Sequence, residues 1–344
     1  MPRSLKSSMP REPRERKQTV LFVGTVCFLC LAALISVGVG STPLDLPGAL
    51  RALMDGNLED GGARILLYVR LPRTVAALLA GSALAVSGTL LQAVLNNALA
   101  GPNIIGVSAG AGFATLLCTA LFPFLPGLLP VAAFIGALAA ALIIYAVALS
   151  TGASRMTLVL AGVAISGILT AASNTVRLLS PDAAAGSTTF FIGGFSGVTL
   201  AGMGLVAPYI LLGIVLAFLC AGALDLLTLG EETAASLGLR VGRTRFLLIL
   251  LAALLAGAAV SFSGLISFVG LLVPHLCRSL FGARHRLLLP AAAATGGLLT
   301  CLCDTLARVL FSPYELPVGI LLSFLGGPFF LYLLLRKKRG RVYA

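Results

Sequence analysis

Residues 70–112 read RLPRTVAALLAGSALAVSGTLLQAVLNNALAGPNIIGVSAGAG, and no charged residue follows Arg73 within this stretch. A bilayer explains so long an uncharged run, because roughly 20 apolar residues are needed to cross about 30 Å of hydrocarbon. Closely spaced small residues, among them Gly81 and Gly88, suit close contact between membrane helices. Polar residues and Pro102 interrupt the run before it becomes apolar again. The stretch therefore predicts a membrane helix, a break, and the start of a second membrane helix.

The composition indicates an integral membrane protein. Of its 344 residues, 58% are hydrophobic and 10% are charged, whereas proteins on average carry about 25% charged residues. The net charge of +12 does not indicate nucleic-acid binding, because the basic residues cluster at the chain ends and in short interruptions between apolar runs. That distribution is typical of membrane topology and of contact with anionic lipid headgroups. The sequence predicts an all-α polytopic membrane protein.

Ten apolar runs are predicted to be transmembrane helices. They cover residues 20–39, 70–93, 103–122, 128–149, 156–179, 200–223, 244–262, 265–281, 287–310 and 316–335. We expect residues 20–335 to form a single transmembrane domain, flanked by a disordered basic tail at 1–19 and a second basic tail at 336–344. The first run is longer than the 7–15 residues of a signal-peptide core, so we interpret it as a retained helix.

The basic residues also predict the orientation of the chain. Ten crossings put both termini on one side. If that side is the cytoplasm, 18 basic residues lie inside (six in the N-terminal tail, seven in loops and five after Leu335) and six lie outside. Lysine and arginine accumulate in cytoplasmic loops. We therefore expect a multi-pass protein of the cytoplasmic (inner) membrane with both termini in the cytoplasm.

A weak internal repeat relates the two halves of the chain. ALLAGSALAVSG at 77–88 is similar to ALLAGAAVSFSG at 253–264, and a proline-containing break follows each copy. By the helix count, the first copy runs inward and the second outward. Inverted repeats of this kind are common in transporters, where the pathway lies between the halves.

Nothing in the sequence indicates catalysis within this chain. A phosphate-binding loop of the form G-x-x-x-x-G-K-[ST] is absent, because none of the four lysines follows a glycine. The two histidines lack the neighbours of a metal-binding motif, and His275 is expected to pack between helices. The seven cysteines lie in apolar runs, where cysteine behaves as a small hydrophobic residue. No metal or cofactor site is predicted.

Asp304 and Arg308 are charged residues inside the ninth apolar run, four residues apart and hence on one helix face. Because a charge in the membrane costs about 2.5–3.5 kcal/mol on insertion scales, such residues tend to pair. We expect an intrahelical ion pair. An ion-coupled secondary transporter would carry several intramembrane carboxylates, whereas Asp304 is nearly alone, so that function is a remote alternative.

A polar stretch at about 224–245 is predicted to lie in the cytoplasm. Glu231 and Glu232 fall in the first turn of an expected short helix, where the helix dipole favours carboxylates, and Gly238 suits its C-terminal cap. Ala234, Ala235 and Ser236 form a surface of small residues that another protein can approach closely. The simpler interpretation is an ordinary connecting loop.

Four motifs carry a resemblance to a known family. They are R-L-P-R at 70–73, S-G-x-x-L-Q at 87–92, N-x-L-A-x-P at 97–102 and G-V-S-x-G-A-G at 106–112. In this order they resemble the FecCD-type permeases, the membrane subunits of ABC importers for iron-siderophores, haem and vitamin B12. The resemblance covers nearly the whole chain and implies the type II ABC importer permease fold. E-L-P-V-G at 315–319 also matches and is interpreted as the turn before the last helix.

The resemblance implies roles for three groups of residues. The cytoplasmic helix would couple to an ATPase through Glu231, Glu232, Ala234, Ala235, Ser236, Leu237, Gly238 and Arg240. A binding protein would dock onto Arg70, Arg73 and Arg308, and the fifth helix and residues 183–197 would line and gate the outer mouth. The predicted pathway is lined by weakly polar residues, namely Ser108, Thr170, Ser173 and Asn174.

The resemblance also implies a function and its partners. The expected assembly holds a second permease subunit, taken to be an identical chain, two cytoplasmic ATP-binding subunits and a periplasmic or lipid-anchored binding protein. The expected cargo is a ferric siderophore, with haem and cobalamin as alternatives.

Overall fold

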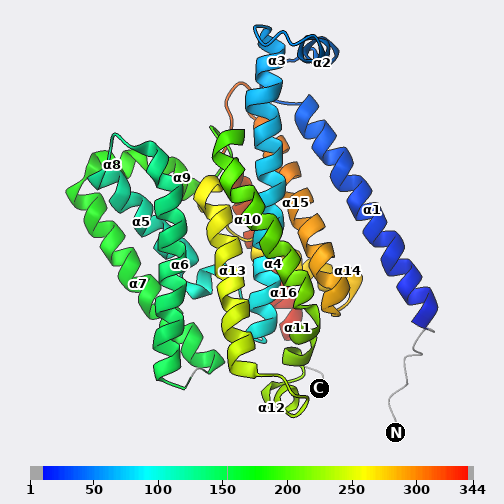
Figure 1. Ribbon diagram of the computed structural model, residues 1–344, viewed down its shortest axis with the longest axis vertical. Coiled ribbons are helices and arrows are strands. Elements are labelled where there is room, and N and C mark those ends of the chain that lie inside the picture. The colour runs from blue at the N-terminus through cyan, green and yellow to red at the C-terminus, as the bar shows by residue number, and fades with distance from the viewer. Residues whose placement is uncertain (1–10, 153, 340–344) are drawn as a thin grey trace.

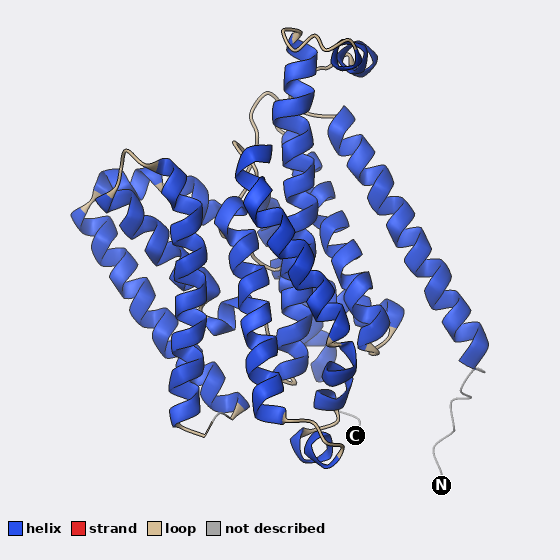
Figure 2. Cartoon of the chain, in the orientation of Figure 1, coloured by secondary structure: helices blue, strands red, loops and turns tan. Residues whose placement is uncertain are grey.

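A computed structural model describes residues 11–152 and 154–339 of the chain, and within these ranges the regular structure is entirely helical (Figure 2). The longer helices are α1 (Arg11–Gly38), α4 (Leu71–Val94), α5 (Val107–Leu121), α6 (Leu129–Ser150), α7 (Arg155–Leu179), α10 (Leu200–Leu219), α13 (Val241–Ser263), α14 (Val269–Phe281), α15 (His285–Val309) and α16 (Val318–Arg339). The shorter ones are α2 (Leu46–Met54), α3 (Gly61–Ile65), α8 (Pro181–Gly186), α9 (Thr188–Ile192), α11 (Ala221–Thr228) and α12 (Glu231–Ser236), with single turns η1 (Leu66–Arg70), η2 (Pro102–Ile105) and η3 (Pro126–Leu128).

The ten long helices correspond to the ten predicted ones, and several boundaries differ. Within the described residues, seven helical segments are long and apolar enough to cross a bilayer, and the apolar parts of α5, α14 and α16 are shorter. Residues 11–19, predicted to be disordered, are the first turns of α1, and the expected helix at 200–223 ends at Leu219 and continues after Cys220 as α11. Residues 1–10 and 340–344 of the predicted tails lie outside the described residues.

The molecule has two ends along the helix axes (Figure 1). We call the end that carries α12 the inner end and the end that carries α2 the outer end. The α1 helix begins and the α16 helix ends at the inner end, as an even number of crossings requires. Residues 61–94 form one continuous helical segment of 34 residues, about 50 Å long at 1.5 Å per residue. Its first turns, α3 and η1, extend beyond the other long helices at the outer end, where α2 lies beside α3 (Figure 1).

The α4 helix lies at the centre of the bundle, because its small residues let neighbouring backbones approach closely. A Cβ atom added to Gly88 would lie 1.7 Å from the carbonyl oxygen of Gly270 in α14, and one added to Gly81 would lie 2.2 Å from that of Gly296 in α15. In the apolar part of α4, 78% of the residues are buried. Backbone packing of this kind replaces the hydrophobic effect between membrane helices.

The two copies of the internal repeat lie in α4 and α13, which pack against each other and run in opposite directions (Figure 1). Each helix is followed by a break and a shorter helix, η2 and α5 in the first case, and residues 264–268 and α14 in the second. The two breaks line a common cavity of about 180 Å³. The arrangement is that of an inverted-topology transporter repeat.

The α1 and α7 helices are much less enclosed than the central helices. In their apolar parts 11% and 17% of the residues are buried, against 72% for α13. The exposed face of α7 is apolar, with Leu160, Val163 and Ile168 each more than 60% exposed. These faces are open to lipid or to another protein.

Candidate functional site

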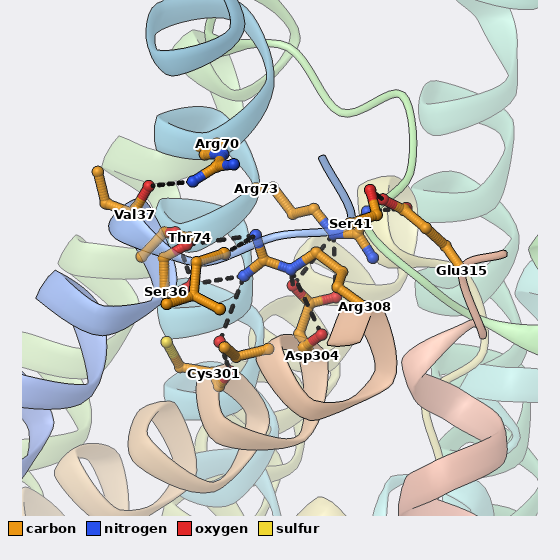
Figure 3. Close-up of polar contacts among 12 residues, drawn as sticks. Ser36, Val37, Ser41, Arg70, Arg73, Thr74, Cys301, Asp304, Arg308 and Glu315 are labelled. Atoms are coloured by element: carbon orange, nitrogen blue, oxygen red, sulfur yellow. Dashed lines mark hydrogen bonds and ion pairs between the residues drawn. The ribbon is translucent and has the colours of Figure 1, made fainter. Parts of the chain in front are cut away.

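The outer end of α1 is held by an arginine from the R-L-P-R motif (Figure 3). Arg70 donates through Nη1 to the carbonyl oxygens of Val37 and Gly38, and through Nη2 to that of Thr42 at 2.6 Å. The last carbonyls of a helix have no partner within the helix and carry partial negative charge. Arg70 therefore caps the C-terminus of α1, and its guanidinium is directed toward the chain rather than away from it.

Arg308 of α15 supports the same helix end from the other side. Its Nη1 donates to the carbonyl oxygen of Ser36 at 3.3 Å, and its Nη2 to the Ser36 hydroxyl at 2.6 Å. Its Nε lies 3.1 Å from Oδ2 of Asp304, so the intrahelical ion pair expected from the sequence is present. Arg308 is 2% exposed.

Arg73 joins this pair to a loop at the outer end of the bundle. Its Nε lies 3.0 Å from Oδ2 of Asp304, and its Nη1 donates to Glu315, in the loop between α15 and α16 (Figure 3). Asp304 is fully buried, accepts from Arg73 and forms an ion pair with Arg308, whereas the Glu315 side chain is 32% exposed. We call Arg73, Asp304, Arg308 and Glu315 the outer charge cluster. Two cations and two anions make it neutral overall.

Arg70, Arg73 and Arg308 were predicted to dock a binding protein, and the structure shows what each of them binds within the chain. Each is at most 5% exposed, and all three bind groups of the chain itself. In this arrangement they hold α1, α4, α15 and the loop after α15 together. Docking through them stays a prediction, and it requires at least one guanidinium to exchange its present partner.

Glu315 gives the outer charge cluster a testable pH dependence. Burial alone would raise the pKa of Glu315, but the Ser41 hydroxyl and the Arg73 guanidinium bind its carboxylate and hold the pKa below its ordinary value of 4.5. A depressed pKa stabilises the folded state above the unfolded-state value, and this contribution is lost as the pH falls through the folded-state value.

We therefore expect Glu315→Gln to lower the thermal unfolding midpoint by a constant amount between about pH 6 and 8, and by progressively less below 4.5. Thermal unfolding of the wild type and of Glu315→Gln in detergent across this range measures the effect. Glu59→Gln, at an exposed outer position, is the control. If the wild type and Glu315→Gln unfolded at the same temperature between pH 6 and 8, the contact of Glu315 with Arg73 would not stabilise the fold.

The predicted pathway residues lie in two places. Ser108 lines the cavity between the two helix breaks, where its hydroxyl donates to Oδ1 of Asn103 at 2.5 Å. Thr170 and Asn174 are on the exposed face of α7, and Ser173 is turned inward with 7% exposure. The structure therefore brings Thr170 and Asn174 onto one face, and neither of them lines the cavity with Ser108. Whether any of the four lines a pathway stays a prediction.

Residues 183–197 form α8, α9 and a loop at the outer end of α7. The Arg177 guanidinium, in the last turn of α7, lies 4.0 Å from the ring centroid of Phe191 in α9, a cation–π contact. Phe191 also lines an open groove of about 350 Å³ with residues of α16, including Ser323 and Phe324. The α9 helix thus lies between the outer ends of α7 and α16.

The short helix α12 forms at the inner end as the sequence predicts. Glu231 and Glu232 are in its first turn. The Gly238 amide donates to the Ala235 carbonyl and the Leu239 amide to the Ala234 carbonyl, at 2.9 and 3.0 Å, with Gly238 at a φ of +88°. This pair of bonds is the Schellman motif, which suits glycine because its φ is positive.

The surface of α12 differs from the prediction at one residue. Ala234 is fully buried within the chain, so it does not belong to the surface of small residues. The other seven residues predicted to couple, Glu231, Glu232, Ala235, Ser236, Leu237, Gly238 and Arg240, are exposed. Leu237 is 59% exposed at the inner end, where an apolar side chain gains from contact with a partner.

Ion pairs at the inner end were not predicted from the sequence. Oε1 of Glu231 lies 3.2 Å from Nε of Arg155 and 2.5 Å from Nη2 of Arg245, which begin α7 and lie in α13. Asp225 of α11 accepts from the backbone amide of His285 at 3.0 Å and lies 2.6 Å from its Nδ1. Asp225 therefore caps the N-terminus of α15, where the helix dipole favours a carboxylate.

The described histidines, cysteines and carboxylates do not form a metal site. No three or more of these side chains are placed to bind one metal ion. His275 packs edge-on against Phe329 of α16, with ring centroids 6.3 Å apart, as a packing histidine would. All seven cysteines are free.

Known proteins identify the family. The model of the FecCD transport family matches residues 28–336 of this chain. The chain belongs to this family. This FecCD permease is 40% identical to the hemin transport system permease protein HmuU of Yersinia pestis over 341 residues, covering 95% of this chain and 98% of HmuU. It is 36% identical to the Fe(3+) dicitrate transport system permease protein FecD of Escherichia coli, with 92% and 99% covered.

A solved structure agrees with the fold. The FecCD permease is similar to a metal-chelate type ABC transporter in an inward-facing conformation, with a TM-score of 0.79, 30% identity and coverage of 92% of this chain and 99% of that one. The chain is thus an integral inner-membrane permease subunit of an ABC importer. Membership of the family implies ATP-binding, substrate-binding and permease partners.

Proposed function

We propose that this permease carries a ferric siderophore across the cytoplasmic membrane, as one of two identical permease chains that work with two cytoplasmic ATPases and an outer binding protein. The observation that carries the proposal is α12, a capped helix exposed at the inner end of a chain whose sequence has no phosphate-binding loop of its own. Relatives named for hydroxamate, citrate and enterobactin import support a ferric chelate as cargo.

Haem is the second candidate cargo. The 40% identity to a hemin permease favours it, and cobalamin has no comparable support among these relatives. None of the predicted pathway residues is a haem-iron ligand such as histidine or cysteine. A pathway of this kind would accept a chelate without binding its metal, so the cargo has to be established by transport.

The coupling surface would be the exposed face of α12. Glu232, Ala235, Ser236, Leu237 and Arg240 are exposed, and α12 lies at the inner end (Figure 1). Small residues permit close approach of an ATPase, and Leu237 supplies an apolar contact. The count of basic residues predicts that the inner end faces the cytoplasm, where an ATPase could reach α12.

The binding protein would dock at the outer charge cluster by taking the place of one of its carboxylates. Glu315 is the most exposed member of the cluster and holds Arg73 from the loop before α16. A carboxylate of the binding protein would replace Glu315 at Arg73, because the guanidinium can pair with either carboxylate. Arg70 and Arg308 would support this site while they hold α1.

The second permease would pack against the open face of α7. That face is apolar, and its few polar side chains include Thr170 and Asn174. Between two copies, these side chains would line a weakly polar passage. An ion-coupled mechanism is disfavoured, because Asp304 is buried and its charge is already balanced by ion pairs with two arginines.

Transport by the reconstituted importer tests the proposal. The permease is incorporated into vesicles with its ATPase inside and its binding protein outside, and radioactive iron is supplied as ferric citrate, ferric hydroxamate or hemin. We expect ATP-dependent uptake of a ferric siderophore. Uptake of hemin alone would show that the cargo is haem instead of a ferric siderophore. Uptake driven by a proton gradient without ATP would contradict the importer mechanism.

A further inference from the structure

We propose that the groove between the inner ends of α6 and α13 binds an anionic phospholipid of the adjacent leaflet, with an acyl chain in the groove and the headgroup at Arg243. The site depends neither on the cargo nor on the ATPase. Three observations carry it: the apolar walls of the groove, its length along the helices, and an arginine without a partner at its mouth.

The groove has apolar walls. The α6 and α13 helices lie side by side (Figure 1) and leave a groove of about 630 Å³ between their inner ends. Its α6 wall consists of Leu142, Tyr145, Ala146 and Leu149, and the ring of Phe246 in α13 lies 5.0 Å from that of Tyr145, centroid to centroid. Leu142 and Leu149 are 40% and 53% exposed, so the groove is open along its side. Such walls favour hydrocarbon over water.

The groove is long enough for much of an acyl chain. It continues toward the middle of the bundle as a narrower gap between the same two helices, and the two parts share three wall residues. Along α13 the whole groove extends from Gly242 to Ala253, about 17 Å at 1.5 Å per residue. This length is about half of the 30 Å hydrocarbon core, which is the depth of one leaflet.

Arg243 lies at the inner mouth of the groove and is available to a ligand. It is exposed, and within the described part of the chain it makes no ion pair or hydrogen bond. Arg245, the other arginine of the groove, is 4% exposed and lies 2.5 Å from Glu231. The described residues that line the two parts include no Asp or Glu. The mouth is therefore positively charged, and arginine pairs well with phosphate oxygens.

The proposed contacts of the importer leave this groove open to the membrane. The second permease is assigned to α7 and the ATPase to α12, and none of the described residues of either helix lines the groove. Arg243 is near the inner end of the apolar segment Val241–Ser263, where headgroups of the adjacent leaflet would lie. Apolar walls along the bilayer and a cation at headgroup depth match the two parts of one anionic lipid molecule.

Tryptophan fluorescence tests the site, because the chain contains no tryptophan. Leu142→Trp places a reporter in the groove wall, and Leu212→Trp places one on α10, where Leu212 is 56% exposed. Each full-length variant is reconstituted in phosphatidylcholine vesicles that contain increasing amounts of brominated phosphatidylglycerol or brominated phosphatidylcholine, because bromine quenches nearby tryptophan. Phosphatidylglycerol should quench Leu142→Trp at about a fivefold lower mole fraction, the effect of one arginine near an anionic headgroup. The two lipids should quench Leu212→Trp equally.

Variants of Arg243 test the headgroup contact. In the Leu142→Trp background, Arg243→Gln should remove the preference for phosphatidylglycerol, whereas Arg243→Lys keeps the charge and should retain it. Arg286→Gln is the control, because Arg286 is exposed at the start of α15 and does not line the groove. A preference that survives Arg243→Gln, or that Arg286→Gln also removes, would overturn the assignment of the headgroup to Arg243.

Ala146→Phe tests the acyl-chain contact by filling the groove. Ala146 is exposed in the groove wall, so the larger ring should be accommodated in the fold and should remove the preference while Arg243 is still present. Ala139→Phe, at an exposed position of α6 that lines neither part of the groove, should retain it. A preference that persists in Ala146→Phe would overturn the placement of the acyl chain.

Two further results would overturn the lipid site by assigning the groove to a protein. If brominated lipids quenched Leu212→Trp but not Leu142→Trp, a second copy of the chain would cover the groove. If addition of the ATPase removed the preference for phosphatidylglycerol, Arg243 would belong to the ATPase contact. We expect neither result, and the importer function would stand in both cases.

Discussion

Replacing Asp304 by asparagine should destabilise the folded protein by about 3–5 kcal/mol, the usual cost of removing one partner from a buried ion pair. The side chain of Asp304 is fully buried and forms ion pairs with Arg73 and Arg308, which are themselves almost completely enclosed. The amide has nearly the same shape, but it leaves two guanidinium groups without their shared counter-charge. Denaturant unfolding in detergent measures the effect.

The control for this variant is Asp182→Asn, at an exposed position in α8. A surface change away from special features is expected to alter stability by no more than about 0.5 kcal/mol. If Asp304→Asn were as stable as Asp182→Asn, the outer charge cluster would not hold the helices together. The arginines would then be better explained by contacts outside this chain.

Gly88→Leu should prevent α4 and α14 from packing as they do. Even a single Cβ atom at this position would lie 1.7 Å from the Gly270 carbonyl oxygen, and backbone cannot move aside as a flexible side chain can. Overpacking a tight interior costs about 1–3 kcal/mol and occasionally more. Because the obstacle here is backbone, we expect the upper end of that range or beyond, with most of the protein lost from the folded membrane fraction.

Gly204→Leu is the matched control. Gly204 is also a glycine within a membrane helix, α10, but nothing lies within 4 Å of the position its Cβ would take. Leucine is the better helix former, so this variant should be at least as stable as the wild type. Equal folded yields for the two variants would contradict the close packing of α4 against α14.

The sequence was sufficient to predict the elements built from local signals. Long uncharged runs predict membrane helices whatever their neighbours, and the ten expected helices are present. The cap of α12 was equally predictable, because acidic residues at its start and Gly238 at its end act within one short segment.

Contacts between distant residues could not be predicted in the same way. Arg73 binds Asp304 and Glu315, which are 231 and 242 residues away in the chain, so no local pattern relates them. The sequence did indicate that Arg73 needs a partner, because charged residues at the edges of apolar runs tend to pair. The sequence paired Asp304 with Arg308, its helical neighbour, and left Arg73 unassigned within the chain.

The burial of Ala234 shows a second limit of prediction from the sequence. Its neighbours in sequence are exposed, and a small side chain suits a docking surface, yet Ala234 is fully buried. Which side of a six-residue helix faces the protein depends on the helices that it touches. Here Glu231 binds α7 and α13, and this contact turns Ala234 inward with them.

The most direct measurement of the central claim is ATPase association with α12 altered at its surface. The permease carrying Ala235→Glu and Leu237→Asp is co-purified in detergent with the ATPase. Met54→Asp, at a residue 88% exposed on the outer end, is the control for folding and yield. If α12 couples the permease to its ATPase, the α12 variant should be recovered folded and without the ATPase, and Met54→Asp should retain it. Equal retention of the ATPase by both variants would contradict the role of α12.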